Sequence, residues 1–516
     1  MEFSTSNICI IGVTTILVIY AWRILNWLWF RPKKTQKFLK DQGLKGTSYK
    51  FLSGDIKELS DMMKEATTKP MSLCHDIAPH VSPFYQKIIS THGKNCFTWM
   101  GTKPVLHVTD PSTIHEVLNN YQQFRKPLVG NPLVALLVKG IVAAEGDRWV
   151  KHRKIINPAF HLQKLKHMVP AFYVSCCEMI DNWEKLVIDT KGSCEVDVWP
   201  HLQKFSSDVI SRTAFGSSFE EGRKIFELQR ELAELIMKAR TSLYIPGSRF
   251  LPTKMNRRMT GIAREVKRLI MSIINKRVVS MKAGEASNDD LLGILLDSND
   301  KEIKQHGNKK FGLSMDDVFE ECKLFYFAGQ ETTGNTLVWT MILLGMHTEW
   351  QTQAREEVLR VFGDKKPDID GLSRLKIINM ILMEVLRLYP PAAILRRHVF
   401  EETKLGNLTI PAGSLVQIDV MILHHAKETW GEYVNEFKPE RFSEGLSKVT
   451  KATYIPFGGG PRLCIGQNFA MLEAKLALAM ILRCFSFELS PSYSHAPHAI
   501  LTLQPQFGAH LILHKL

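Results

Sequence analysis

Apolar residues recur at helical spacing along much of this chain, and the longest regular run begins near residue 314. Ser314 and Asp317 have the spacing of a capping box, in which each side chain satisfies a backbone N–H at the start of a helix. No proline interrupts the run before Pro367. The pattern predicts a long helix, one face of which is formed by residues three or four apart: Val318, Cys322, Phe325, Gly329, Thr332 and Thr336.

The centre of that face is small and hydroxylated, whereas most apolar stripes of this kind are bulky core. A mid-helix glycine such as Gly329 costs about 1 kcal/mol relative to alanine. The hydroxyl of Thr332 can bond a carbonyl of its own helix and open the helix locally. Together they predict a groove that admits a diatomic ligand, with Glu331 beside it to handle protons.

Three shorter helical runs are predicted elsewhere. One contains Trp149 and Arg153, which share a face because they are four residues apart; a second ends at Pro390; a third covers 467–482. Residues 281–313 are mostly polar, and we expect a surface connection there around a short apolar piece, LLGILL.

The N-terminus has the pattern of a membrane anchor. From Phe3 to Tyr20 there is no charged residue, and a span needs about 20 residues. A cleaved signal peptide would need a basic start and a small-residue cleavage site, but Glu2 is the only early charge and large residues follow the apolar run. We therefore expect an uncleaved anchor in residues 1–30, with one span from about Phe3 to Trp22, and a single domain in 31–516.

Charge refines this assignment. Basic residues follow the apolar run, which by the positive-inside rule keeps that side in the cytoplasm: Arg23, Arg31, Lys33, Lys34 and Lys37. The net charge of +14 fits an anionic membrane surface or an acidic partner. No nucleic-acid-binding motif accompanies it, so we expect no nucleic-acid partner. Nine scattered cysteines do not form a disulfide pattern, which favours a reducing compartment.

The candidate chemistry centres on FGGGPRLCIG, residues 457–466. Cys464 follows Arg462 and precedes a helical run, and both a cation and a helix N-terminus lower the pKa of a cysteine. Gly460 and Gly466 allow a sharp turn that brings backbone N–H groups near the sulfur. Two alternatives are a buried structural cysteine and a hydrolase nucleophile, which would need a histidine base such as His424 or His425.

The whole phrase resembles the haem-thiolate signature of the cytochromes P450, matching at Phe457, Gly460, Arg462, Cys464 and Gly466. The resemblance implies a mainly α fold with small β-sheets, preceded by one N-terminal transmembrane helix. It also implies haem b as cofactor, with Cys464 as the axial ligand of the iron. The residues expected to contact the haem are Cys464, Arg462, Phe457, Trp149, Arg153 and Arg397, although Arg396 is an alternative to Arg397.

Two further family motifs are present. Gly329 and the pair Glu331–Thr332 match the pattern over the oxygen-binding face of the haem, which implies oxygen activation with these two residues as the catalytic pair. A haem protein without oxygenase activity remains the non-enzymatic alternative, and the intact pair speaks against it. The family also implies a structural network of Glu384, Arg387 and Arg441.

The implied activity is a monooxygenase that uses O2 and electrons from NADPH. The chain lacks a dinucleotide-binding fingerprint, so the electrons must come through NADPH–cytochrome P450 reductase, with the catalytic domain in the cytosol on the endoplasmic reticulum membrane. Candidates for the basic docking face are Lys151, His152, Lys154, Lys164 and Lys166.

The substrate is expected to be a small hydrophobic terpenoid. Phrases such as HRKIINPAF and ECKLFYFAGQETT resemble the plant group that includes secologanin synthase and several triterpenoid oxidases. We expect a pentacyclic triterpenoid; an iridoid glucoside or a terpenoid hormone such as a gibberellin is the alternative. Gly130, where secologanin synthase has a histidine, weighs against the iridoid. The candidate pocket residues are Leu128, Val129, Ala328, Ala393, Ile394 and Leu395.

Overall fold

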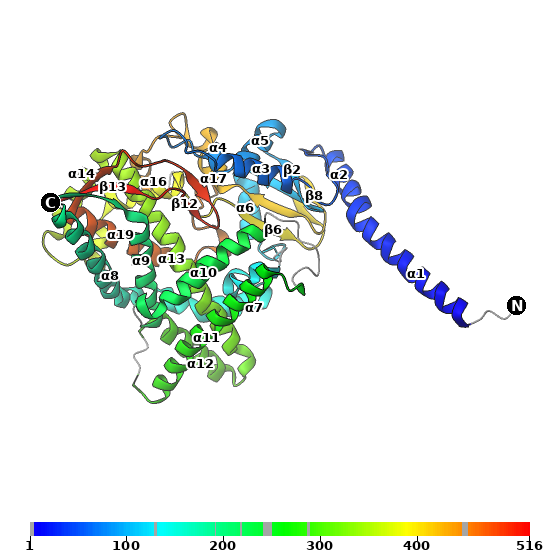
Figure 1. The fold of residues 1–516 in the computed structure, drawn as a ribbon, viewed down its shortest axis with the longest axis horizontal. Coiled ribbons are helices and arrows are strands. Elements are labelled where there is room, and N and C mark those ends of the chain that lie inside the picture. The colour runs from blue at the N-terminus through cyan, green and yellow to red at the C-terminus, as the bar shows by residue number, and fades with distance from the viewer. Residues whose placement is uncertain are drawn as a thin grey trace.

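Helices dominate the computed structural model, and small sheets lie at the edges of the helical body (Figure 1). The structure describes residues 5–127, 132–190, 192–216, 219–240, 250–285, 289–445 and 452–516. The prediction of a mainly α fold with small β-sheets is confirmed. The principal helices are α3 (Ile56–Ala66), α5 (Pro83–His92), α6 (Pro111–Asn119), α7 (Gly146–Ile156), α8 (Leu162–Asp189), α9 (Val198–Phe215), α10 (Phe219–Arg240), α11 (Lys254–Lys282), α12 (Leu291–His306), α13 (Met315–Met346), α14 (Thr348–Phe362), α16 (Lys376–Leu388) and α19 (Gln467–Cys484).

The largest sheet has six strands in the order β1-β2-β3-β9-β6-β4. Its parallel and antiparallel pairs are mixed, and residues far apart in sequence meet in it, as where Arg397 pairs with Val416. A second sheet has the order β10-β13-β5, and two hairpins complete the set. The strands are β1 (Lys45–Gly46), β2 (Cys96–Met100), β3 (Lys103–Val108), β4 (Phe124–Arg125), β5 (Ser193–Asp197), β6 (Leu395–Val399), β7 (Thr403–Leu405), β8 (Leu408–Ile410), β9 (Leu415–Ile418), β10 (Phe485–Leu489), β11 (Pro497–Ala499), β12 (Leu503–Pro505) and β13 (His510–Lys515).

Helix α13 runs through the centre of the helical body. It begins as predicted: Ser314 Oγ accepts from the Asp317 N–H at 3.1 Å, and the Asp317 carboxylate accepts from the Ser314 N–H at 3.1 Å. Helices α9, α19 and α16 pack against it, and residues 333–345 are all buried. A helix buried on all sides in this way is a core helix, and its polar side chains, among them Asn335 and Thr340, are hydrogen-bonded within the core.

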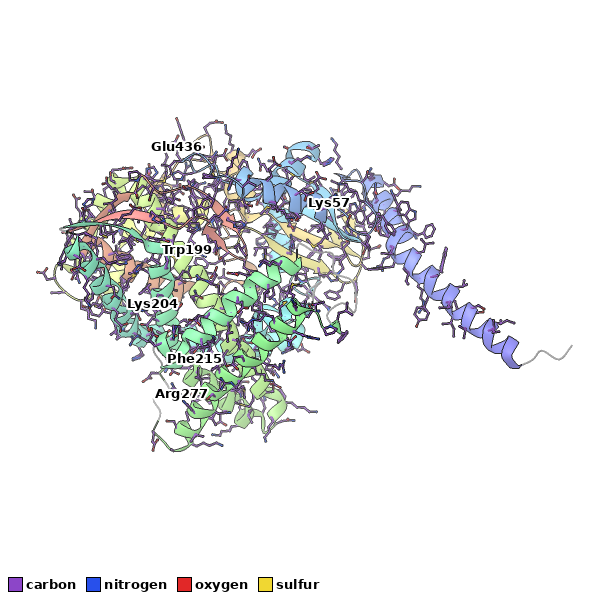
Figure 2. All side chains as sticks on the ribbon, in the orientation of Figure 1. Lys57, Trp199, Lys204, Phe215, Arg277 and Glu436 are labelled. Atoms are coloured by element: carbon purple, nitrogen blue, oxygen red, sulfur yellow. The ribbon has the colours of Figure 1, made fainter. Side chains whose placement is uncertain are left out.

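The N-terminal helix stands away from the body (Figures 1 and 2). Helix α1 (Thr5–Leu25) continues through a π-helical turn, η1 (Asn26–Phe30), into α2 (Arg31–Asp41). The large apolar side chains of α1 are exposed from Ile10 onward. Within the described residues, this continuous helix is the one long and apolar enough to cross a membrane. Exposed apolar residues on an isolated helix fit a membrane anchor.

The expectation of a surface connection at 281–313 is wrong. Helix α12 occupies residues 291–306, and its first residues, 291–295, are buried. Asp290 caps it by accepting from the Gly293 N–H at 2.7 Å, and Gly307 ends it with a φ of 62°. The apolar piece is therefore the buried start of a helix whose remaining face is solvated and polar.

Candidate active site

Cys464 lies in a tight turn immediately before α19. Its backbone N–H donates to the carbonyl oxygen of Phe457 at 3.0 Å, which closes the turn. Gly458 and Gly460 have φ angles of 77° and 64°, in the left-handed region that favours glycine. At Gly460 a Cβ would also lie 2.4 Å from the carbonyl oxygen of Leu118, so no side chain fits there. The glycines thus fix the path of the chain that presents the cysteine.

The Cys464 thiol is accessible at the surface of the turn. Its side chain is solvent-accessible, and yet burial raises the pKa of the thiol; the Gly466 N–H and the Arg153 charge oppose that rise. Arg153 also donates to the Leu463 carbonyl oxygen at 2.9 Å. Two expectations are corrected. The charge that acts on Cys464 is that of Arg153 rather than Arg462, and Gly466, with a φ of −87°, needs no glycine-specific conformation.

Arg462 belongs to a group of partly buried charges beside the turn. Its guanidinium lies 4.5 Å from the ring centroid of Trp149, and its Nη1 donates to the Ala144 carbonyl oxygen at 2.8 Å. Its Nη2 lies 2.7 Å from Oε1 of Glu145. The same Glu145 oxygen accepts from the backbone N–H of Lys126 at 2.7 Å. Trp149 and Arg462, predicted separately, therefore stack on each other.

This group carries more positive than negative charge. Burial, followed by repulsion from Arg397 and Arg462, lowers the pKa of Lys126 to about 7. Burial, followed by Arg462, lowers the pKa of Arg397 to about 10. Among the described residues, the buried Nε of Arg397 has no hydrogen-bond partner. Three cations thus face one carboxylate, Glu145, which is an arrangement that calls for additional anions. Sequence reasoning missed Lys126, because a single lysine carries no motif.

Strand geometry separates the side chains of Arg396 and Arg397. Successive side chains of β6 point to opposite faces of the sheet. Arg396 donates to Gln417 at 2.7 Å and to the Tyr85 hydroxyl at 3.0 Å, so its guanidinium is satisfied away from the charged group. Arg397 is 3% exposed and lies near Arg462. The structure brings Arg397, and not Arg396, into the charged group.

Beyond its exposed first turn, α13 is buried except for a short stretch near its middle. Residues 327–332 are partly exposed, whereas 321–326 and 333–345 are buried. A Cβ at Gly329 would lie 2.8 Å from Cδ1 of Ile210, so the glycine permits close packing of α9. Thr332 Oγ1 donates to the Ala328 carbonyl oxygen at 2.8 Å, as its position in the helix predicted. The exposed stretch coincides with AGQETT, the segment singled out in the sequence.

The cysteine turn and α13 meet through one aromatic residue. Phe160, in the short 3-10 helix η4 (Asn157–Phe160), lies with its ring centroid 5.8 Å from that of Phe325 on α13. Its ring edge also lies 3.9 Å from the Cβ position of Gly466. Phe160 therefore contacts α13 at Phe325 and the cysteine turn at Gly466.

Glu384 and Arg387 form a buried bidentate ion pair. Arg387 donates to both carboxylate oxygens, at 2.7 and 2.8 Å, and both side chains are 0% exposed. Arg387 also donates to the His424 carbonyl oxygen at 2.9 Å, and Arg441 lies 3.4 Å from Glu384. The structure thus brings together the three residues that the family order predicted.

The histidines considered as bases for a nucleophilic cysteine are engaged elsewhere. All four ring nitrogens of His424 and His425 lie within 3.2 Å of backbone groups or an amide oxygen. Neither histidine contacts Cys464 in the described part of the chain. The arrangement gives no support to a hydrolase nucleophile.

The candidate pocket residues do not form one group. Ala328 and Ala393 pack against the main core, which also receives the cysteine turn through Ile465. Ile394 and Leu395 pack against two other apolar clusters. Leu128 and Val129 lie outside the described residues.

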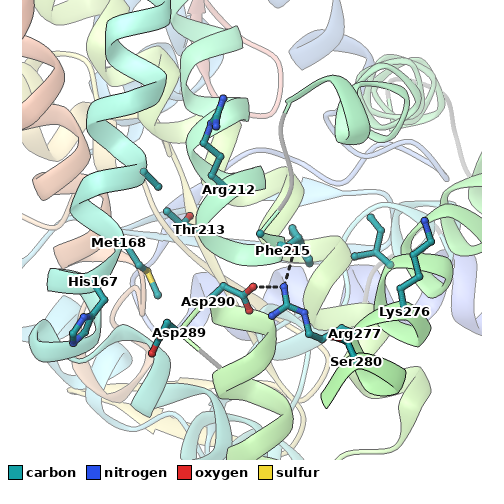
Figure 3. A pocket seen from close by; sticks show the side chains of 13 residues that line it. His167, Met168, Arg212, Thr213, Phe215, Lys276, Arg277, Ser280, Asp289 and Asp290 are labelled. Carbon is teal, nitrogen blue, oxygen red and sulfur yellow. Dashed lines mark hydrogen bonds and ion pairs between the residues drawn. The ribbon is translucent and has the colours of Figure 1, made fainter. Parts of the chain in front are cut away.

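A cleft of about 580 Å³ opens elsewhere, between α8, α9, α11 and the start of α12 (Figure 3). Arg277 crosses it to pair with Asp290 and donates to the Phe215 carbonyl oxygen at 3.1 Å. None of the residues predicted for the site lines this cleft. It is therefore separate from the cysteine turn.

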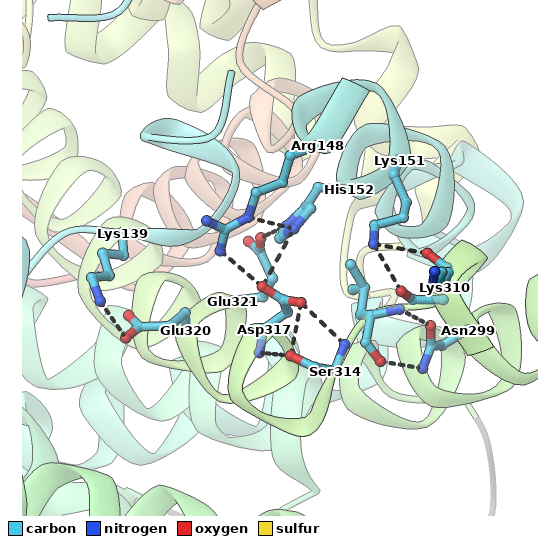
Figure 4. A network of polar contacts seen from close by, with 12 residues as sticks. Lys139, Arg148, Lys151, His152, Asn299, Lys310, Ser314, Asp317, Glu320 and Glu321 are labelled. Atoms are coloured by element: carbon cyan, nitrogen blue, oxygen red, sulfur yellow. Dashed lines mark hydrogen bonds and ion pairs between the residues drawn. The ribbon is translucent and has the colours of Figure 1, made fainter. Parts of the chain in front are cut away.

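The basic residues of α7 are mostly engaged within the protein (Figure 4). His152, expected on a docking face, is 0% exposed and lies 2.5 Å from Oε1 of Glu321 on α13. Lys151 donates to the Gly312 carbonyl oxygen at 2.9 Å, and Lys154 pairs with Glu302 at 2.8 Å. His152 is thus an internal contact between α7 and α13 and no part of a docking face.

Comparison with known proteins identifies the family. The cytochrome P450 family profile matches residues 75–508. The chain is a cytochrome P450. It is 60% identical over 514 residues to cytochrome P450 CYP72A219 of Panax ginseng, covering 99% of this chain and 98% of that one. It is 52% identical over 518 residues to cytochrome P450 72A15 of Arabidopsis thaliana, and 52% identical over 522 residues to 7-deoxyloganic acid hydroxylase of Catharanthus roseus, covering 100% of both chains in each case.

This P450 is therefore a monooxygenase of the plant 72A group. The family uses haem b and O2 and takes electrons from a reductase. The residues present fit the haem. Its two carboxylates would supply the anions that Lys126, Arg397 and Arg462 lack, including a partner for the Nε of Arg397. The accessible Cys464 would supply the thiolate ligand.

Proposed function

We propose that Cys464 is the axial ligand of the haem iron and that Lys126, Arg397 and Arg462 bind the haem carboxylates. The excess positive charge beside the cysteine turn carries this proposal, because buried cations require anionic partners. Trp149 holds the Arg462 guanidinium at its ring face, and Arg153 braces the turn at the Leu463 carbonyl. Phe457 closes the turn through its backbone carbonyl.

When bound, thiolate-ligated haem supplies the activation of O2 and the transfer of one oxygen atom to carbon. The protein contributes substrate orientation and proton delivery. Thr332 occupies the accessible stretch of α13, and its hydroxyl keeps acceptor capacity while it donates to Ala328. Glu331, the next residue, is a carboxyl group able to take up and release a proton. We assign proton delivery to these two residues.

The test compares two variants with the unchanged enzyme. A positioned proton donor contributes about 10²–10⁴-fold. Thr332→Ala should keep the reduced-CO spectrum and most NADPH consumption, while product per NADPH falls and peroxide release rises. Glu331→Gln should lower the same ratio without weakening substrate binding. Unchanged coupling in both variants would show that protons arrive by another route.

For the substrate we infer a terpenoid, with a pentacyclic triterpenoid as the first candidate. Ala328 and Ala393 are small, apolar and partly exposed, which suits a large hydrocarbon skeleton. The reaction would be oxidation of an unactivated carbon. Microsomes that contain this chain and a plant reductase should convert a triterpenoid in a panel with iridoids and gibberellins, with products identified by mass spectrometry.

An iridoid is the second candidate, because 7-deoxyloganic acid hydroxylase of Catharanthus roseus is 52% identical to this chain. The same panel separates the two: turnover of 7-deoxyloganic acid alone would overturn the triterpenoid assignment. We place the enzyme at the endoplasmic reticulum membrane with NADPH–cytochrome P450 reductase as its partner. The exposed apolar helix α1 supports the membrane part of this proposal.

A further inference from the structure

Two neighbouring side chains contact the carboxylate of Glu331, and both contact the same oxygen, Oε1. Oε1 accepts from the Thr502 hydroxyl at 2.8 Å and lies 3.4 Å from Nδ2 of Asn335. Asn335 Nδ2 also donates to the Thr502 hydroxyl oxygen at 2.9 Å. Glu331 is partly exposed, whereas Thr502 is 7% and Asn335 0% exposed. Both of these contacts fall on Oε1, which leaves Oε2 as the oxygen able to carry a proton.

The direction of these hydrogen bonds is fixed by the surrounding residues. The indole Nε1 of Trp199 is only a donor, and it lies 3.0 Å from Oδ1 of Asn335. Gln203 donates to the same oxygen at 2.8 Å. The Asn335 amide must therefore turn its NH2 group toward Thr502. Because the Thr502 oxygen accepts from this NH2 group, its own proton is directed to Glu331.

Thr502 belongs to the turn between β11 and β12, and this turn is tied to two parts of the site. The Trp339 indole on α13 donates to the Leu503 carbonyl oxygen at 3.1 Å. The Leu503 N–H donates to the Pro391 carbonyl oxygen at 3.0 Å, and Pro391 precedes the pocket candidate Ala393 by two residues. The turn therefore links the chain at Pro391, just before Ala393, to α13 at Glu331.

We propose that Thr502 is a positioning residue that holds Oε1 of Glu331, so that Oε2 is the oxygen that takes up and releases the proton during turnover. This rests on the proposed proton role of Glu331. Within the described residues no ionisable side chain makes a hydrogen bond or ion pair with Glu331, and the titratable group of the same hairpin is His498 on β11. The neutral hydroxyl of Thr502 is thus its main fixed contact.

The test replaces the hydroxyl by a methyl group of similar size. Thr502→Val should keep the reduced-CO spectrum and the thermal unfolding midpoint, while product per NADPH falls by up to about tenfold, less than on complete loss of a proton donor. Thr502→Ser keeps the hydroxyl and should restore product per NADPH, which a purely structural role of the side chain does not predict.

Thr340→Val is the matched control, because Thr340 is a buried threonine of α13 that donates only to the Thr336 carbonyl oxygen of its own helix. It should leave coupling unchanged. If Glu331→Gln lowers product per NADPH while Thr502→Val leaves this ratio unchanged, the positioning role is wrong and the proton role of Glu331 stands. If Glu331→Gln has no effect on product per NADPH, the proton role of Glu331 and the positioning role of Thr502 are both wrong. Should Thr502→Val fail to load haem, Thr502→Ala removes the same hydroxyl and the same outcomes apply.

Discussion

At the scale of single residues, the site is defined by charges that the chain leaves uncompensated. Lys126, Arg397 and Arg462 share one carboxylate, although burying cations without partners is costly. Cys464 is likewise accessible while burial raises its pKa. The anionic groups of a bound haem would compensate these charges, as proposed above.

Replacement of the cysteine tests the ligand assignment. Cys464→Ala should abolish the reduced-CO band of a thiolate-ligated haem and all product formation, because alanine has no ligand atom. Cys322→Ala and Cys484→Ala are the controls, since burial raises the pKa of both thiols and neither lies in the turn. Survival of the band in Cys464→Ala would contradict the assignment.

Lys126 tests the anion-binding group with a measurement independent of turnover. If Lys126 binds a haem carboxylate as proposed, Lys126→Met removes a charge-assisted hydrogen bond worth about 1.5–3 kcal/mol. Haem should therefore pass to apomyoglobin about tenfold faster or more, as followed by absorbance. Lys126→Arg keeps the cation and should keep the slow rate. Equal rates in all three proteins would exclude Lys126 from carboxylate binding.

At the scale of elements, buried polar contacts join helices and loops around the site. The Glu384–Arg387 pair ties α16 to the segment that contains Glu436 and Arg441, through carbonyl oxygens and the ion pair itself. A second set joins His75, Tyr389 and His495 by hydrogen bonds of 3.0 and 3.4 Å. These contacts hold in place elements that apolar packing alone leaves free to slide.

Breaking the ion pair should be costly. Arg387→Met leaves Glu384 buried and unpaired, which destabilises by about 3–5 kcal/mol. We expect a correspondingly lower urea midpoint for loss of the helical circular dichroism signal. The control is Arg268→Met on α11, which removes an arginine with the same three-residue spacing to a glutamate, Glu265, but on the surface. Similar midpoints for the two variants would show that the buried pair does not hold the elements.

Three buried histidines predict acid sensitivity. Burial lowers the pKa of His75 and His424 to about 3 and that of His495 to about 4. In the unfolded chain a histidine has a pKa of about 6.5, so between pH 6.5 and 4 the unfolded state binds more protons. Stability is then fully present above pH 6.5 and falls by up to about 4 kcal/mol per pH unit as the pH decreases. Urea unfolding at several pH values measures this slope, and His75→Gln should reduce it by about one third.

At the scale of the whole molecule, helix α1 and the body differ in the side chains that they expose. Helix α1 exposes apolar side chains, whereas α2 contacts the body through Leu39, which is 0% exposed. Between them, the Tyr49 hydroxyl donates to the Leu28 carbonyl oxygen at 2.6 Å. Packing on the body therefore begins near residue 28, close to the expected boundary at residue 30.

The orientation of the anchor can be tested with an existing sequence feature. Asn407, in the motif Asn-Leu-Thr, lies in the exposed turn between β7 and β8 and is accessible for N-glycosylation if the domain enters the lumen. We expect no mobility shift on endoglycosidase treatment, and degradation of the domain by protease added to sealed microsomes. Glycosylated Asn407 or a protected domain would reverse the proposed topology.

A chain starting at Arg31 should still bind haem.

The sequence by itself determined features that depend on local order. The capping box at Ser314, the apolar N-terminal helix and the phrase around Cys464 are runs of neighbouring residues, and their physical meaning is set by spacing along the chain. The family resemblance added the grouping of Glu384, Arg387 and Arg441. Helix α12 was missed although its cap signals, Asp290 and Gly307, are present, because polar composition outweighed them.

Only the tertiary structure decided which charges meet. Lys126, Arg397 and Arg462 come from β6 and from two loops far apart in sequence, and their mutual repulsion exists only once they share a buried space. The local pattern placed His152 on a basic surface, but the fold buries it against Glu321. The fold also brings Thr502 to Glu331, which lies 171 residues away in the sequence. Burial and long-range contact set the energy of a charge or hydroxyl, and neither is encoded in the spacing of neighbouring residues.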